Sequence, residues 1–124
     1  MTTRSSNTGC CIVGGGPAGM MLGYLMARAG VATTVLEKHA DFLRDFRGDT
    51  VHPSTLDLLA DLGLSKEFDA LPHRDVTRLA VDLPDGVWPA ADFSRLSNPH
   101  PYLSLVPQWD LLETLARQAA QYPS

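Results

Sequence analysis

Residues 9–19 read GCCIVGGGPAG, and this stretch decides the fold of the chain. It opens with a short apolar run over residues 9–13, which is typical of a β-strand buried on both faces. After the glycines, Pro17 begins a segment with helical spacing that ends at Gly30. Residues 31–37 are rich in β-branched side chains and predict a second strand. The order strand–helix–strand predicts two parallel strands joined by a right-handed crossover.

The glycines have the spacing Gly14-x-Gly16-x-x-Gly19, directly after the first strand and at the start of the helix. In a dinucleotide-binding turn the first glycine allows the tight turn and the second lets the backbone approach a pyrophosphate. The third lets the helix and the strand pack closely. The free N–H groups and the dipole of the helix N-terminus then attract the phosphates. The predicted cofactor-binding residues of this turn are Gly14, Gly16, Pro17, Ala18 and Gly19.

An acidic residue, Glu37, follows Gly19 by eighteen positions and lies at the end of the second predicted strand. A carboxylate there accepts hydrogen bonds from both ribose hydroxyls of an adenosine and repels a 2′-phosphate. We therefore predict that the first dinucleotide bound is FAD or NAD rather than NADP. The alternative is a simple glycine turn with a solvated glutamate, and the joint spacing of strand, turn, helix and acid disfavours it.

Two helices are predicted in the middle of the chain. Ser54 has the properties of an N-cap, with Asp57 as its capping-box partner three residues later. This helix ends at Gly63, and residues 65–71 predict another short helix. Residues 38–52 show no clear period and are predicted to form a loop.

A β-hairpin and a last helix are predicted in the second half. Residues 77–83 alternate apolar with polar side chains, and the turn residues 84–86 separate them from Val87 and Trp88. Residues 98–102 carry two prolines and predict a linker. Pro107 then begins the last helix, at a position where proline is tolerated.

The composition sets limits on the class of protein. The chain has 124 residues, of which 44% are hydrophobic and 19% charged, as in soluble globular proteins. A net charge of -4 disfavours a nucleic-acid partner, and no apolar run reaches the roughly 18 residues that span a membrane. Residues 1–8 are polar and contain no signal sequence, so cytoplasm is the predicted compartment.

The adjacent Cys10 and Cys11 form neither a disulfide framework nor a metal pattern, and we predict both in the buried strand.

Three stretches together resemble FAD-dependent monooxygenases of the para-hydroxybenzoate hydroxylase type. The first is the GGGPAG turn with the strand end Leu36-Glu37-Lys38, which many flavoproteins share. The second covers residues 47–59 (RGDTVHPSTLDLL) and the third residues 101–112 (PYLSLVPQWDLL). These two narrow the resemblance to this group of enzymes, and the matches span residues 9–115.

The resemblance also implies roles for single residues. Arg47 matches an arginine that reaches the pyrophosphate side of the flavin, where a forked cation suits phosphate oxygens. Gln108 matches a glutamine that hydrogen-bonds near the ribityl and pyrophosphate groups, and Lys38 belongs to the cofactor-binding set. Arg44 either shares the phosphate role or is a solvated loop residue. His52 is either a substrate-side residue or a structural one.

The activity that the resemblance implies is monooxygenation of an aromatic or similar substrate by FAD and O₂, with NAD(P)H as a transient co-substrate. Because the cofactor carries this chemistry, we assign no catalytic side chain. One alternative is another FAD- or NAD-dependent oxidoreductase, and a second is a truncated, non-catalytic fragment that binds adenine nucleotides. The length of the encoding reading frame separates these possibilities. The substrate, the choice between NADH and NADPH and the oligomeric state stay open.

The predicted fold class is α/β: an incomplete FAD-binding Rossmann-like (βαβ, GxGxxG) domain with the start of a substrate-domain β-hairpin. Two parallel strands and a hairpin do not complete a doubly wound sheet, which has about five or six strands. The later Asp-Gly and Gly-Asp motifs of the family are also missing, so we interpret the chain as a fragment that is inactive alone. The predicted division is a disordered start (1–8), the FAD-binding βαβ unit with the following helices (9–75), the substrate-domain hairpin (76–103) and a helix returning to the FAD domain (104–124).

Overall fold

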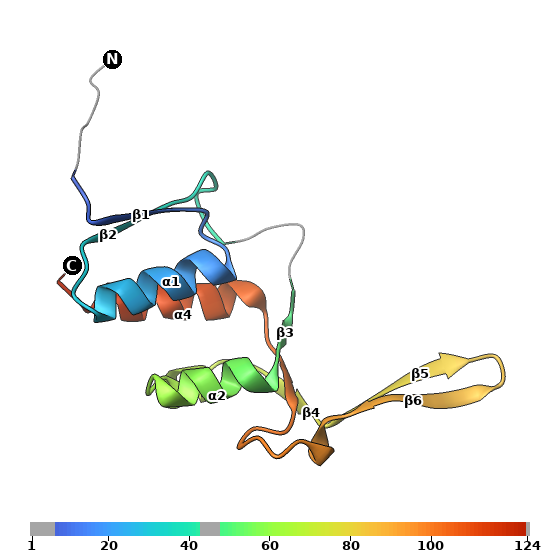
Figure 1. Ribbon diagram of the computed structural model, residues 1–124. Coiled ribbons are helices and arrows are strands. Elements are labelled where there is room, and N and C mark those ends of the chain that lie inside the picture. Colours follow the sequence, from blue (N-terminus) through green and yellow to red (C-terminus); the bar gives the residue numbers. More distant parts are fainter. Residues whose placement is uncertain (1–6, 43–47, 124) are drawn as a thin grey trace. The chain divides into compact units, whose positions relative to one another are not determined.

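The computed structural model describes residues 7–42 and 48–123 (Figure 1). Its contacts divide the chain into two compact units. Among the described residues, the first unit contains 7–42 and 111–123, and the second contains 48–110. No helix in these described ranges combines the length and the apolar character that crossing a membrane requires.

The first unit contains the predicted strand–helix–strand. Strand β1 (Cys10–Val13) pairs in parallel with β2 (Thr33–Leu36), and helix α1 (Pro17–Arg28) connects them (Figure 1). The helix ends as predicted, because Gly30 has a φ of 76°, a left-handed conformation that glycine adopts without strain. The α/β class and the βαβ order predicted from the glycine-rich stretch are therefore confirmed.

The prediction that the first strand is buried on both faces is wrong for this chain. Only Ile12 is buried, whereas Cys10 is half-buried, Cys11 is exposed and Val13 is 84% exposed. Ile12 points toward α1, since an atom built as Cβ on Gly23 would lie 3.9 Å from its Cδ1. Side chains alternate between the two faces of a strand, so Cys11 and Val13 point away from this helix. The two cysteines are consequently not residues of a buried core.

Helix α4 (Gln108–Ala119) follows Pro107, where the last helix was predicted to begin. Its Leu112 and Leu115 are fully buried. Beyond its end, the ring of Tyr122 meets that of Tyr24 on α1 edge-on, with 6.0 Å between ring centres. The chain after α4 is therefore held against α1 within the first unit.

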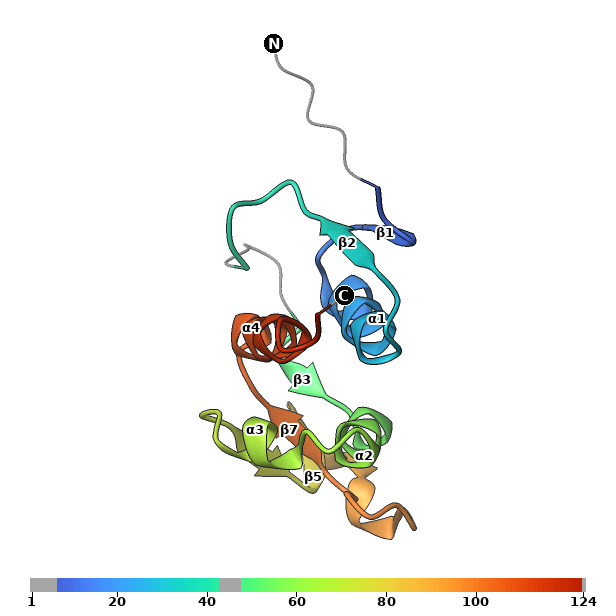
Figure 2. The same ribbon diagram turned by 90° about the vertical axis from the view of Figure 1, so that its left-hand side faces the viewer.

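The second unit is built from short strands and helices. Its three-stranded sheet has the order β3–β7–β4 and is antiparallel throughout; β3 and β7 are seen together in Figure 2. A separate two-stranded hairpin is formed by β5 and β6. The elements are β3 (Thr50–Val51), α2 (Pro53–Asp61), α3 (Ser65–Asp69), β4 (Arg74–Val76), β5 (Arg78–Leu83), β6 (Gly86–Asp92), a 3-10 turn (Phe93–Arg95) and β7 (Leu103–Leu105).

Two expectations for this unit need correction. The predicted loop over residues 38–52 in fact ends in strand β3, whose two residues pair with β7 far along the chain. Ser54 is not an N-cap, because α2 begins at Pro53 with His52 at the cap position and without a capping side chain. Proline suits this first helical position, since its missing N–H would have no partner there.

Asp57 does not complete a capping box either and instead binds a distant segment. Its carboxylate accepts hydrogen bonds from Asn98 Nδ2 at 2.7 Å and from His100 Nδ1 at 2.7 Å. The backbone N–H of His100 donates to the same group at 3.3 Å. The bonds from Asn98 and His100, in that order, hold the pKa of Asp57 below its ordinary value. This carboxylate therefore ties the proline-containing linker to α2.

The hairpin is confirmed at its predicted position. Its two-residue turn leads into Gly86, which has a φ of 128° and therefore requires glycine. Side chains on both strands are largely exposed, including Val87 at 69% and Trp88 at 61%. Among the described residues these apolar side chains have no covering element, and assignment of the hairpin to a substrate domain stays a prediction.

Candidate cofactor-binding site

At two positions of the glycine turn, Gly14 and Gly19, the backbone geometry admits only glycine. Gly14 has a φ of 113°, where other residues are strained. A Cβ on Gly19 would overlap the carbonyl oxygen of Gly14 and lie 3.4 Å from Ile12 Cγ2. The N–H of Gly14 donates to the carbonyl of Leu36 at 2.8 Å. The turn is thus packed against the start of α1 and joined to the end of β2.

Gly16 and the first turn of α1 are open, in contrast. A Cβ built on Gly16 meets no atom within 4 Å, and Pro17 and Ala18 are exposed. Within the described residues, no acceptor takes the backbone N–H groups of Gly16, Ala18 and Gly19. The first turn also carries no acidic side chain. Free N–H groups at a helix N-terminus form an anion site, so this arrangement suits a pyrophosphate.

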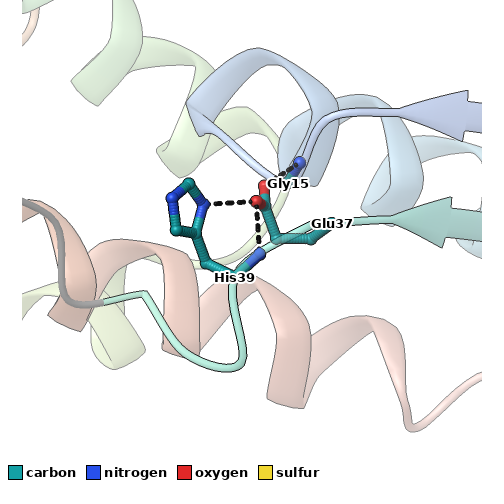
Figure 3. A network of polar contacts seen from close by, with 3 residues as sticks. All are labelled: Gly15, Glu37 and His39. Carbon is teal, nitrogen blue, oxygen red and sulfur yellow. Dashed lines mark hydrogen bonds and ion pairs between the residues drawn. The ribbon is translucent and has the colours of Figure 1, made fainter.

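Glu37 follows β2 directly and lies beside this turn (Figure 3). Its Oε2 accepts the backbone N–H of Gly15 at 2.8 Å, across 22 residues of sequence. Its Oε1 accepts the backbone N–H of His39 at 3.0 Å, and His39 Nδ1 lies 2.7 Å from the same oxygen. The carboxylate predicted to bind the ribose is therefore held at the glycine turn, and its binding role stays a prediction.

Sequence reasoning missed two residues of this arrangement, Gly15 and His39. A Cβ on Gly15 would lie 3.1 Å from both Cβ and Oε2 of Glu37, so the middle glycine lets the glutamate approach. The run of three glycines was a usable signal, because the GxGxxG spacing explains only Gly14 and Gly16 within it. His39 gave no signal, since a histidine in a loop has many possible roles.

The remaining predicted positions are only partly described. Lys38 is exposed beside Glu37. Gln108 donates from Nε2 to the carbonyl of Gly48 at 3.3 Å, within the second unit. Arg47, the neighbour of Gly48, lies outside the described residues, and so does Arg44.

His52, with its two possible roles, has a structural function through its backbone. Its carbonyl accepts the first hydrogen bonds of α2, from Thr55 N at 2.9 Å and Leu56 N at 3.0 Å. Its side chain is exposed, and the structure gives that side chain no further role.

Comparison with known proteins identifies the family. Residues 7–123 match the model of the FAD binding domain family, and the chain belongs to this family. This match confirms FAD as the cofactor that the fingerprint predicts.

Similar curated proteins are named as monooxygenases. The chain is 30% identical over 126 residues to 6-methylpretetramide 4-monooxygenase of Streptomyces rimosus, covering 95% of this chain and 28% of that protein. It is 33% identical to rifampicin monooxygenase of Streptomyces venezuelae, covering 87% of this chain and 22% of that protein. It is 36% identical to an uncharacterized aromatic compound monooxygenase of Bacillus subtilis, over 78% of this chain and 19% of that protein. The chain thus spans less than a third of the length of these relatives.

Solved structures show the same fold. The anhydrotetracycline hydroxylase of Streptomyces rimosus matches with a TM-score of 0.77 and 32% identity, covering 94% of this chain and 23% of that one. The p-nitrophenol 4-monooxygenase of Pseudomonas putida matches with a TM-score of 0.79 and 24% identity, over 94% of this chain and 30% of that one. The resemblance to FAD-dependent monooxygenases seen in the sequence is confirmed.

The described residues fit the adenosine half of FAD. The open Gly16 backbone suits its phosphates, as do the N–H groups of Ala18 and Gly19, for which the described residues offer no acceptor. Glu37 suits the diol of its ribose, since a carboxylate accepts hydrogen bonds from both hydroxyls.

Proposed function

We propose that this chain supplies the ADP-binding part of the FAD site in an NAD(P)H-dependent flavoprotein monooxygenase. The single observation that carries the proposal is the glycine turn with Glu37 held beside it, in a chain of the FAD binding domain family. The names of three relatives, each at least 30% identical, favour monooxygenation over other flavin chemistry. One of those names specifies an aromatic compound, in line with an aromatic or similar substrate.

In this proposal the chain binds and orients the cofactor. The N–H groups of Gly16, Ala18 and Gly19 hold the pyrophosphate, and Glu37 accepts the ribose hydroxyls. Arg47 adds a forked cation to the phosphates, while Lys38 and Gln108 complete the set. When bound, FAD supplies the electron transfer to O₂ that no side chain can provide. We therefore propose no catalytic side chain in this segment.

The ribose assignment is tested by Glu37→Arg. We expect ADP and FAD binding to weaken by about 1–3 kcal/mol, because hydrogen bonds to a charged acceptor are lost. Calorimetric titration measures this, with Glu113→Arg as the matched control, since Glu113 is an exposed acid on α4. Equal affinity of wild type and Glu37→Arg would show that the ribose is held elsewhere.

The activity is tested on the protein encoded by the complete reading frame. With FAD, ¹⁸O₂ and either NADH or NADPH, we expect one ¹⁸O atom in a hydroxylated aromatic substrate. In the control, unlabelled O₂ and H₂¹⁸O are used, and the product should carry no ¹⁸O. Oxidation of NAD(P)H without incorporation of ¹⁸O would favour a dehydrogenase or reductase. ADP binding without FAD binding would favour a non-catalytic nucleotide-binding protein. A cytoplasmic location is part of the proposal and is checked by cell fractionation.

A further inference from the structure

His39 makes two contacts with one oxygen of Glu37 (Figure 3). Its backbone N–H donates to Oε1 at 3.0 Å, and its ring Nδ1 lies 2.7 Å from the same atom. The other oxygen, Oε2, accepts the N–H of Gly15 at 2.8 Å. Both ends of the carboxylate are therefore held, one by the glycine turn and the other by the loop that follows β2.

The chemistry of the pair fixes the direction of the ring contact. An ionised carboxylate only accepts hydrogen bonds, so Nδ1 of His39 must carry the hydrogen. Among the described residues, the polar contacts of the His39 ring are with Glu37 alone. The ring is 45% exposed, whereas the Glu37 side chain is 18% exposed. An exposed imidazole thus holds a mostly covered carboxylate in one orientation.

Holding the carboxylate has a consequence for ligand binding. A glutamate side chain at a strand end samples several rotamers, and fixing one of them costs conformational entropy. Where Glu37 is already fixed, a ribose diol binds without paying that cost, which is the general benefit of preorganisation. The contact from His39 matters in this way only to a ligand that bonds to Glu37.

We propose that His39 is a positioning residue for nucleotide recognition. It orients Glu37 toward a vicinal diol and so raises the selectivity of the site for adenine nucleotides with an intact ribose. This inference rests on the assignment of Glu37 as the ribose acceptor in the proposed function.

The experiment compares two ligands and four proteins. ADP and 2′,3′-dideoxy-ADP, which lacks both hydroxyls, are titrated by calorimetry into wild type, His39→Ala, His39→Leu and His39→Asn. We expect His39→Ala and His39→Leu to bind ADP about three- to tenfold more weakly, since a carboxylate that has lost the ring contact is less firmly held and must be ordered further on binding. Dideoxy-ADP should bind equally to all four proteins. His39→Asn, whose amide places a donor near the position of Nδ1, should restore most of the ADP affinity.

The possible failures are distinguishable. If both ligands weaken equally in His39→Ala and His39→Leu, His39 only supports the loop and the proposal is overturned. Circular dichroism shows whether each variant folds. If His39→Ala does not fold, His39→Leu replaces it in the comparison, because leucine keeps the bulk of the ring. Glu37→Ala is titrated with ADP as a fifth protein, and loss of its ADP affinity without loss in His39→Ala or His39→Leu would overturn this inference alone. Unchanged ADP affinity in Glu37→Ala would overturn the ribose assignment itself.

Discussion

The backbone of Gly19 lies so close to the carbonyl oxygen of Gly14 that a Cβ atom at position 19 would overlap it. Gly14 in turn donates its N–H to Leu36 on β2 at 2.8 Å. This chain of contacts joins the first turn of α1, the glycine turn and the second strand. The distance between helix and sheet at the glycine turn is therefore set by the absence of a single side chain.

Gly19→Ala should destabilise the protein by about 1–3 kcal/mol, the usual cost of forcing an extra methyl group into a packed site. The clash is with backbone rather than with a flexible side chain, so α1 must shift away from β1. Urea unfolding followed by circular dichroism measures the loss. Wild-type stability of Gly19→Ala would mean that α1 and the turn are less closely packed than the structure shows.

Gly16→Ala should have the opposite pattern, with little change in stability and a loss of ADP affinity. Its φ of -77° suits alanine, and the added Cβ meets no protein atom within 4 Å. We expect a stability loss of no more than about 1 kcal/mol, because alanine is a poorer N-cap than glycine but its methyl group would meet no protein atom here. ADP should bind about tenfold more weakly, since the methyl group fills the space that the pyrophosphate backbone contact needs. Calorimetry on both glycine variants separates packing from ligand approach, and unchanged ADP affinity would place the phosphates elsewhere.

The elements that sequence predicted well are those with strong local signals. The βαβ unit has glycines where its backbone requires them, including Gly30 after α1, and in the second unit Gly63 ends α2 in the same way; both have a φ of 76°. The hairpin was predictable from the turn residues 84–86 and from the alternation of apolar and polar side chains over residues 77–83. Such signals lie within a few residues of the feature that they determine.

The elements that sequence missed depend on distant partners. Strands β3, β4 and β7 have two or three residues each, too few to show a period, and β3 pairs with β7 across more than fifty positions. Asp57 had the spacing of a capping box, but Asn98 and His100 bind it instead. The exposed Val13 shows a further limit, because an apolar strand does not reveal which of its faces this chain covers.

Acid should weaken the second unit through Asp57. Its pKa is lower in the folded protein than its ordinary value of 3.8, because Asn98 and His100 donate to the charged carboxylate. A group with a depressed folded pKa contributes stability above its unfolded pKa and loses that contribution as the pH falls through the folded pKa. We therefore expect Asp57→Asn to melt at a lower temperature than wild type at neutral pH. The difference should shrink below about pH 4, where the carboxyl becomes protonated.

The control for this prediction is Asp82→Asn. Asp82 is exposed on the hairpin, and within the described part of the chain its side chain makes no hydrogen bond or ion pair. Its substitution should leave the melting curve unchanged at every pH. A constant difference between Asp57→Asn and wild type from neutral pH down to pH 3 would show that shape, and not charge, accounts for the contribution of Asp57.

This chain should bind FAD about as tightly as ADP and no more tightly than about 1 µM. The contacts that the structure describes, the glycine turn and Glu37, serve the ADP portion that the two ligands share. Tight binding of a cofactor requires burial of most of its surface, about 70–90%. The chain spans 28% of the length of 6-methylpretetramide 4-monooxygenase, so we expect most contacts to the isoalloxazine ring in the rest of such a protein.

Parallel calorimetric titrations of the 124-residue chain with FAD and with ADP measure both dissociation constants, and Glu37→Arg should weaken the binding of both ligands equally. A submicromolar constant for FAD, about -8 kcal/mol or better, with much weaker ADP binding would show that these residues also hold the flavin ring.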